Sequence, residues 1–234
     1  MLGFFIYNFL YMHIENFIKL KKEITSLTQE LNIPEPLLVA VTKKQTVNKI
    51  IDLINLGHRN FGENYVQEGL EKICKINNSI IDWHFIGPIQ SNKTKLITEN
   101  FNWIHSIDRI KIYNRIKDEA LIQNKKINFL IQINTSNEDS KSGIRPEIVE
   151  EFISNISLNE NMRFRGIMSI PSNTSDINIL TQEFKLMNNL FNKIKQNFPE
   201  VDTLSMGMSQ DFALAIQSGA TMLRIGTKIF GERT

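Results

Sequence analysis

The sequence predicts one α/β domain that closes into a (β/α)8 barrel. Eight short apolar runs alternate with amphipathic stretches, and no linker, repeat or low-complexity segment divides the 234 residues. Alternation of this kind joins parallel strands through helical crossovers, and eight such units build this barrel. An open doubly wound sheet is the alternative, but its Gly-x-Gly-x-x-Gly phosphate fingerprint is absent after the first apolar run.

The first half of the chain is predicted to supply an initial helix and four strand–helix units. The initial helix covers 14–31, where apolar residues recur at helical spacing, and Pro34 and Pro36 end it. Gly57 closes the helix that begins at Val47, in the position after a helix that glycine commonly takes. Strands are predicted at 37–42, 60–63, 83–86 and 103–107, and the remaining helices at 65–75, 90–98 and 108–124.

The second half is predicted to supply the other four units. The continuous apolar run 127–133 is predicted to be a strand, and the polar loop 134–145 follows it. Pro146 is expected at the first position of the next helix, where a backbone N–H would have no partner within the helix. Ser209 is the expected N-cap of a helix over 209–218. The remaining strands are predicted at 164–169, 201–206 and 222–225, the longest amphipathic helix between Ile177 and Phe198, and a short closing segment at 226–234.

The composition excludes several classes of function. Lysine and arginine number 27 and aspartate and glutamate 25, so the net charge is +2, and no basic block suggests nucleic-acid binding. The single cysteine, Cys74, excludes an internal disulfide and a cysteine metal cluster. It shares an apolar helical face with Leu70 and Ile73, which indicates a small core residue. With 41% apolar residues, the chain can bury a full core.

The first twelve residues are almost wholly apolar, and Lys19 is the first basic residue. This run is too short to span a bilayer, and without a basic start and a small-residue cleavage site it does not resemble a signal peptide. Three interpretations remain: an extended first helix, a weak membrane-surface anchor, or a misassigned start with Met12 as the true first residue. We favour the first and the last. Residues 1–13 are therefore treated as an extension and 14–234 as the barrel, with a cytoplasmic location and no membrane contact expected.

Lys43 directly follows the apolar run 37–42. A lysine at the carboxyl end of a buried strand is poorly hydrated on one side, so its amine can lose its proton more readily and attack a carbonyl. An ordinary solvated loop lysine is the other interpretation, and Lys43 alone does not decide between them.

The loops after the last two strands contain the features of a phosphate site. Residues 205–209 and 224–227 combine glycines, hydroxyls and helix starts, and Arg224 adds a positive charge. Ordinary loop glycines and N-caps would show the same pattern, but strands seven and eight are where this barrel usually binds phosphate. Strand one is next to strand eight in a closed barrel, so Lys43 would face this site. A Schiff-base lysine beside a phosphate site is what pyridoxal phosphate requires.

Seven short motifs lie between about residue 37 and the C-terminus. They are 40–43 (AVTK), 61–68 (FGENYVQE), 83–93 (WHFIGPIQSNK), 140–143 (SKSG), 165–171 (RGIMSIP), 204–209 (LSMGMS) and 224–231 (RIGTKIFG). In this order and spacing they resemble the YggS/PROSC family of pyridoxal phosphate homeostasis proteins. The residues before the first motif inherit nothing from this resemblance.

The resemblance implies a single barrel of the alanine-racemase N-terminal type, without the second β-domain of those racemases. It also implies that pyridoxal phosphate is held as a Schiff base on Lys43, while Arg224 faces the pyridine nitrogen and leaves the ring a weak electron sink. Asn64 is expected near the ring. The resemblance assigns the phosphate to Ser205, Gly226 and Thr227, with backbone help from Met206 and Gly207.

Other polar residues receive no role in this prediction. His84 and His105 lie on strands without metal-ligating partners, so they are interpreted as satisfied strand histidines, although His84 could reach the pocket. Lys141 could also visit the pocket, but an exposed loop lysine is the preferred interpretation. No metal site and no catalytic residue are assigned.

The preferred function is a monomeric carrier and regulator of intracellular pyridoxal phosphate, with apo-enzymes of this cofactor as candidate partners. An amino-acid racemase of weak activity is the main alternative, and a cofactor-free Schiff-base aldolase is the third. Racemization requires two bases on opposite faces of the ring.

Overall fold

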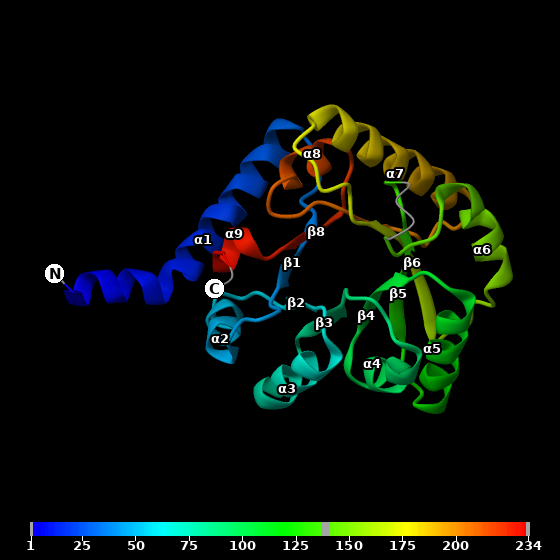
Figure 1. Cartoon of the computed structure of the whole chain (residues 1–234), viewed down its shortest axis with the longest axis horizontal. Coiled ribbons are helices and arrows are strands. Elements are labelled where there is room, and N and C mark those ends of the chain that lie inside the picture. Colours follow the sequence, from blue (N-terminus) through cyan, green and yellow to red (C-terminus); the bar gives the residue numbers. More distant parts are fainter. Residues whose placement is uncertain (1, 137–140, 233–234) are drawn as a thin grey trace.

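Eight parallel strands form a closed barrel in the computed structural model, which describes residues 2–136 and 141–232 (Figure 1). Each strand pairs with the next one along the chain, and the last pairs with the first, with Val39 opposite Arg224. The predicted (β/α)8 architecture is therefore confirmed.

The strands agree closely with their predicted ranges, because buried parallel strands are continuous apolar runs that end at polar residues. The largest difference is β7, which is shorter than predicted. The strands are β1 (Leu37–Val41), β2 (Asn60–Glu63), β3 (Asp82–Phe85), β4 (Trp103–Ile107), β5 (Ile127–Ile133), β6 (Met162–Ser169), β7 (Thr203–Ser205) and β8 (Met222–Ile225).

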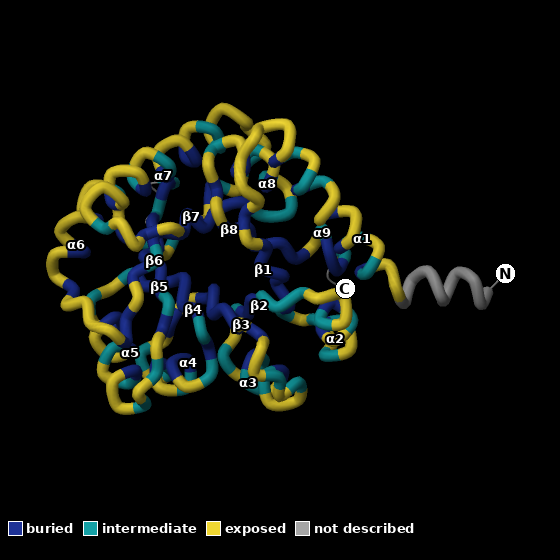
Figure 2. The backbone as a smooth tube through the Cα atoms, turned by 180° about the vertical axis from the view of Figure 1, so that it is seen from behind, coloured by how far each residue is buried: buried dark blue, intermediate teal, exposed yellow. Residues whose placement is uncertain are grey.

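The helices surround the barrel and cover its outer face (Figures 1 and 2). A 3₁₀ turn at Ser91–Lys93 directly precedes α4, and another at Pro146–Ile148 directly precedes α6. The α-helices are α1 (Leu2–Glu30), α2 (Val47–Asn55), α3 (Val66–Ile76), α4 (Thr94–Asn100), α5 (Ile110–Ile122), α6 (Val149–Asn155), α7 (Ile177–Asn197), α8 (Phe212–Gln217) and α9 (Thr227–Phe230).

Two local predictions are wrong. Helix α8 begins after Asp211, and Ser209 does not cap it, because the Ser209 hydroxyl instead accepts the backbone N–H of Lys228 at 3.1 Å. Cys74 is exposed rather than part of the core, because the face of α3 that packs against the barrel contains Val66, Gly69 and Ile73 instead. Gly57 follows α2 with a φ of +88°, as expected for a residue that ends a helix.

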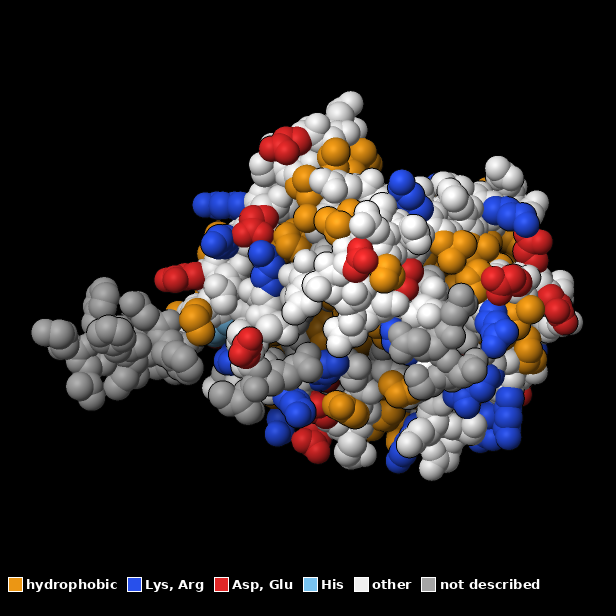
Figure 3. All heavy atoms as spheres, turned by 45° about the horizontal axis from the view of Figure 1, so that its top comes forward, with side chains coloured by type: hydrophobic (Ala, Val, Ile, Leu, Met, Phe, Trp, Pro, Cys, Tyr) orange, Lys and Arg blue, Asp and Glu red, His pale blue; other side chains and the backbone are white. Residues whose placement is uncertain are grey.

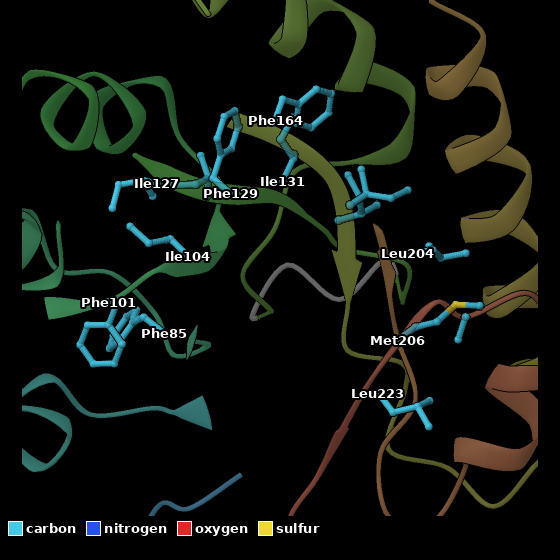
Figure 4. Close-up of a cluster of buried hydrophobic side chains, with 14 of the residues drawn as sticks. Phe85, Phe101, Ile104, Ile127, Phe129, Ile131, Phe164, Leu204, Met206 and Leu223 are labelled. Atoms are coloured by element: carbon cyan, nitrogen blue, oxygen red, sulfur yellow. The ribbon is translucent and has the colours of Figure 1, made fainter. Parts of the chain in front are cut away.

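The main core lies between the strands and the helices, and Figure 2 shows buried strands inside exposed outer helix surfaces. Aromatic side chains dominate part of this layer, where the rings of Phe129 and Phe164 stack (Figure 4). The ring of Tyr113 also contacts Phe129. Side chains that point into the barrel alternate with these, so Val39 and Met222 belong to a separate inner cluster. Arg224 is two residues from Met222 on β8 and shares this inner face.

The N-terminal helix joins the barrel before the predicted boundary at residue 14. His13 is buried, and its Nε2 lies 2.9 Å from a carboxylate oxygen of Asp52 on α2. The side chains of residues 1–10 lie outside the described part of the structure, so the proposed start at Met12 stays a prediction. None of the described helices is long and apolar enough to cross a membrane.

Candidate functional site

A cavity of about 880 Å³ lies at the carboxyl ends of the strands. Its walls come from the ends of β1, β2, β3 and β8, from the loops after β5, β6 and β7, and from α8. Active sites of this barrel form at the same face. Its volume suits a small organic ligand.

The cavity brings together five of the residues singled out from the sequence: Lys43, Asn64, Arg224, Gly226 and Thr227. The side-chain oxygen of Asn64 is buried and has no hydrogen-bond partner among the described residues. A buried acceptor without a donor is unfavourable, so this position suits a ligand that donates a hydrogen bond.

Arg224 is a buried cation at the floor of the cavity. Its guanidinium donates to the Ser205 hydroxyl at 2.6 Å and to the Ser169 carbonyl at 2.8 Å, and no carboxylate of the described residues forms an ion pair with it. Burial lowers the pKa of Arg224 to about 10, although Asp211 acts in the opposite direction. Both hydrogen-bond acceptors are neutral, so the guanidinium has no carboxylate in direct contact among the described residues, and the site favours an anion or an electron-rich acceptor.

A chain of hydrogen bonds leads from Arg224 through the barrel interior. The Ser205 hydroxyl lies 3.4 Å from His105 Nδ1, His105 Nε2 lies 2.9 Å from His84 Nδ1, and His84 Nε2 lies 3.1 Å from Asn60 Oδ1. Arginine only donates and the Asn60 oxygen only accepts, so one direction satisfies every contact. Ser205 donates to His105, His105 to His84, and His84 to Asn60, with both imidazoles neutral.

The pKa values of both histidines agree with this neutral arrangement. Burial lowers the pKa of His84 to about 3, with a smaller effect of the same sign from His58. Burial also places the pKa of His105 well below its ordinary value, with further lowering by His84 and Arg224. Both side chains are satisfied strand histidines, as predicted, and neither is among the residues that line the cavity.

The remaining three predicted residues do not line the cavity. Ser205 is fully buried and contacts Arg224, while Met206 belongs to the core between barrel and helices. Gly207 has a φ of +92°, and a Cβ there would lie 2.6 Å from the Ala215 Cβ, so only glycine fits. From the same loop, Met208 and Ser209 reach the cavity instead.

Sequence reasoning missed the wall formed by residues 170–175, in the loop after β6. Glu183 of α7 fixes this wall, because its carboxylate accepts both the backbone N–H of Ser172, at 2.8 Å, and the Ser172 hydroxyl. The polar run 172–175 directly after a predicted strand was the available signal. Lys141 was expected to be exposed, but it is half-buried and lines the cavity.

Comparison with known proteins assigns the family. The sequence model of the alanine racemase N-terminal domain matches residues 18–234. A pyridoxal phosphate homeostasis protein of Pasteurella multocida is 45% identical over 225 residues, which cover 94% of this chain and 97% of the relative. Its counterpart in Vibrio alginolyticus is 48% identical over 200 residues, 84% of this chain and 86% of the relative. The chain belongs to the pyridoxal phosphate homeostasis protein family.

A solved structure supports the same assignment. PipY of Synechococcus elongatus, determined with pyridoxal phosphate bound, superposes with a TM-score of 0.78 at 29% identity. The match covers 89% of this chain and all of PipY. The resemblance drawn from seven motifs is therefore confirmed, as is the single-barrel architecture. The described residues of this chain form the cavity without a second β-domain.

Proposed function

We propose that this protein binds pyridoxal phosphate in the cavity at the barrel mouth and takes part in the homeostasis of this cofactor. The observation that carries the proposal is the meeting of the Lys43 amine and the unpaired Arg224 charge in one cavity. The names of its relatives and the ligand of PipY support it. Delivery of the cofactor to apo-enzymes, a monomeric state and a cytoplasmic location accompany this proposal as predictions.

The residues of the cavity fit the cofactor, which supplies an aldehyde, a phosphate and an electron-withdrawing pyridine ring. Lys43 would add its amine to the aldehyde carbon and form a Schiff base with loss of water. Gly226 and Thr227 would bind the phosphate through backbone N–H groups and the Thr227 hydroxyl. The loop that contains Gly226 passes close to β1, since a Cβ at Gly226 would lie 3.3 Å from the Val41 carbonyl oxygen.

Arg224 would donate a hydrogen bond to the pyridine nitrogen. A guanidinium donates but does not give up its proton near neutral pH, so the nitrogen would stay unprotonated and the ring would withdraw electrons weakly. Ser205 would hold the Arg224 side chain in place for this role, because its hydroxyl accepts a hydrogen bond from the guanidinium. In this arrangement Ser205 acts on the cofactor through Arg224 rather than through the phosphate.

Thr227→Val is expected to weaken retention of pyridoxal phosphate about tenfold to hundredfold, because a hydrogen bond to a charged group contributes about 1.5–3 kcal/mol. Thr227 is exposed at the start of α9, so the fold should be unaffected. Visible absorbance during equilibrium dialysis measures the retention. Thr181→Val, on the exposed side of α7, is the control. Equal retention by the unmodified protein, Thr227→Val and Thr181→Val would show that the phosphate does not bind at the end of β8.

Amino-acid racemization is the second candidate function, and one observation favours it. Lys141 lines the cavity together with Lys43, so the cavity contains a second amine that could serve as the second base. Against it, a pyridine ring whose nitrogen accepts a hydrogen bond from Arg224 and stays unprotonated would stabilise a carbanion poorly. We therefore retain the carrier as the proposed function.

The exchange of α-protons in heavy water distinguishes the two candidates. Across a panel of amino acids, the protein is expected to exchange far more slowly than typical enzyme turnover, which is on the order of 1–1,000 per second. Lys43→Ala provides the blank, and Lys141→Ala shows whether the second amine contributes. Exchange within the enzymatic range that both substitutions abolish would establish a racemase and overturn the carrier proposal.

A further inference from the structure

An ion cluster is buried behind Lys43, and the proposed function does not account for it. Lys72 of α3 is 5% exposed, and its ammonium donates to Glu63 Oε1 at 2.7 Å and to Glu68 Oε1 at 2.7 Å. Its third hydrogen bond goes to the backbone carbonyl of Thr42 at 2.6 Å. A lysine has three donors, so this ammonium is fully satisfied without water.

The cluster holds the peptide groups on both sides of Lys43. The Thr42 carbonyl, which Lys72 binds, belongs to the peptide group before Lys43. The Lys44 N–H, which Glu68 Oε1 accepts at 2.5 Å, belongs to the peptide group after it. Glu63 strengthens the first contact, because its Oε1 also accepts the Thr42 hydroxyl at 2.5 Å. One cluster therefore restrains the backbone on each side of the Lys43 Cα.

The backbone after Lys43 adopts a conformation that needs such restraint. Lys44 has a φ of +62°, in the left-handed region that residues other than glycine rarely adopt. A conformation of this kind persists only where surrounding contacts determine it, and it is often found at functional sites. Here the hydrogen bond from the Lys44 N–H to Glu68 holds the backbone in that conformation.

We propose that the Lys72–Glu63–Glu68 cluster is a positioning device that directs the Lys43 amine into the cavity. This inference rests on the proposed function, because it assigns the cluster a role only if Lys43 is the reactive lysine. None of its three members is among the residues that line the cavity, so we treat them as positioning residues.

Stability alone explains this arrangement poorly. Glu63 is fully buried, and burial raises its pKa while the Lys72 contact lowers it. Buried ion clusters often contribute less to stability than apolar side chains of the same volume, because desolvation offsets the attraction between the charges. An ion cluster does, however, impose directions on its partners, which apolar side chains do not.

Glu68 offers the sharpest test, because it is half-buried and its removal leaves the Lys72–Glu63 pair intact. Glu68→Ala removes the acceptor of the Lys44 N–H, and Glu68→Gln restores a neutral oxygen acceptor. Glu71→Ala, at an exposed position on the same helix, is the matched control. Lys72→Met provides a second variant, in which the side-chain length is kept and the charge is lost.

Two rates are measured on the full chain freed of cofactor, each corrected for the folded fraction from circular dichroism. The first is the rate at which added pyridoxal phosphate becomes fixed to Lys43 by borohydride. The second is the rate of acetylation of Lys43 by acetic anhydride as a function of pH, read by mass spectrometry. Misplacing a reacting group slows a reaction by about tenfold to a hundredfold, so we expect Glu68→Ala to lose this much in the first rate.

The outcomes separate this inference from the proposed function. Slow fixation in Glu68→Ala, substantial recovery in Glu68→Gln and an altered pH profile of acetylation would support positioning. If the unmodified protein fixes cofactor on Lys43 and Glu68→Ala behaves like Glu71→Ala in both rates, the positioning role is wrong. If the unmodified protein fixes no cofactor on Lys43, the proposed function itself fails. Lys72→Met checks the result if Glu68→Ala does not fold.

Discussion

Replacing Lys43 with alanine is expected to abolish the bond between this protein and pyridoxal phosphate. The purified protein should absorb visible light in the presence of the cofactor, and borohydride should then fix the cofactor to Lys43. Without the amine, phosphate and ring contacts alone remain, and we expect retention to weaken at least about a hundredfold, which corresponds to about 2.8 kcal/mol. Absorbance spectra and peptide mass spectrometry after reduction measure both effects.

Two other lysines serve as matched controls for this substitution. Lys141 lines the same cavity, and Lys44 is the neighbour of Lys43 in the chain. Lys141→Ala and Lys44→Ala should both keep the cofactor fixed to Lys43, although Lys44→Ala changes a residue with a positive φ. Covalent cofactor on Lys141 in the Lys43→Ala protein would show that the other amine of the cavity is the reactive one.

Acidification is expected to destabilise the fold strongly through the buried histidine pair. His84 and His105 are neutral in the folded barrel, whereas in the unfolded chain they bind protons below their ordinary pKa of 6.5. Their stabilising contribution is therefore complete above pH 6.5 and is lost as the pH falls toward about 3, the pKa of folded His84. By pH 5 each histidine should remove about 2 kcal/mol from the free energy of unfolding.

Urea unfolding between pH 8 and pH 5 measures how the free energy of unfolding depends on pH. The His84→Gln variant removes the contribution of one of the two histidines. The variant should lose about 2 kcal/mol less than the unmodified protein over this range. His58, whose pKa burial lowers to about 4, contributes equally to both proteins and does not affect the comparison. Equal pH dependence of the two proteins would mean that the pair is not neutral in the folded state. Protonation would also break the contacts that lead through Ser205 to Arg224.

Much of this fold could be predicted because a parallel barrel leaves a periodic signal in the sequence. Strands such as β2, β4, β5 and β8 have the predicted bounds, since each is a short segment between stretches of helical periodicity. Helix α8 was misplaced because a serine before an apolar run resembles an N-cap, while the Ser209 hydroxyl is already bound to the N–H of Lys228.

The cavity could be predicted only in part. Lys43, Asn64, Arg224, Gly226 and Thr227 follow or end strands, so their place at the barrel mouth follows from topology. The direction in which a loop residue points depends on backbone angles that no periodicity reveals. Ser205 and Met208 lie in one loop, yet the first contacts Arg224 inside the barrel and only the second lines the cavity.

The sequence by itself determined the order of strands and helices, the family, and the lysine that ends β1, because these depend on residues close together in the chain. Only the tertiary structure revealed the buried Lys72–Glu63–Glu68 cluster and the hydrogen bonds from Asn60 to Arg224. These contacts join different strands and helices, and His105 and Ser205 are 100 residues apart. Closure of the barrel brings such groups within hydrogen-bond distance, and burial then requires each to find a partner.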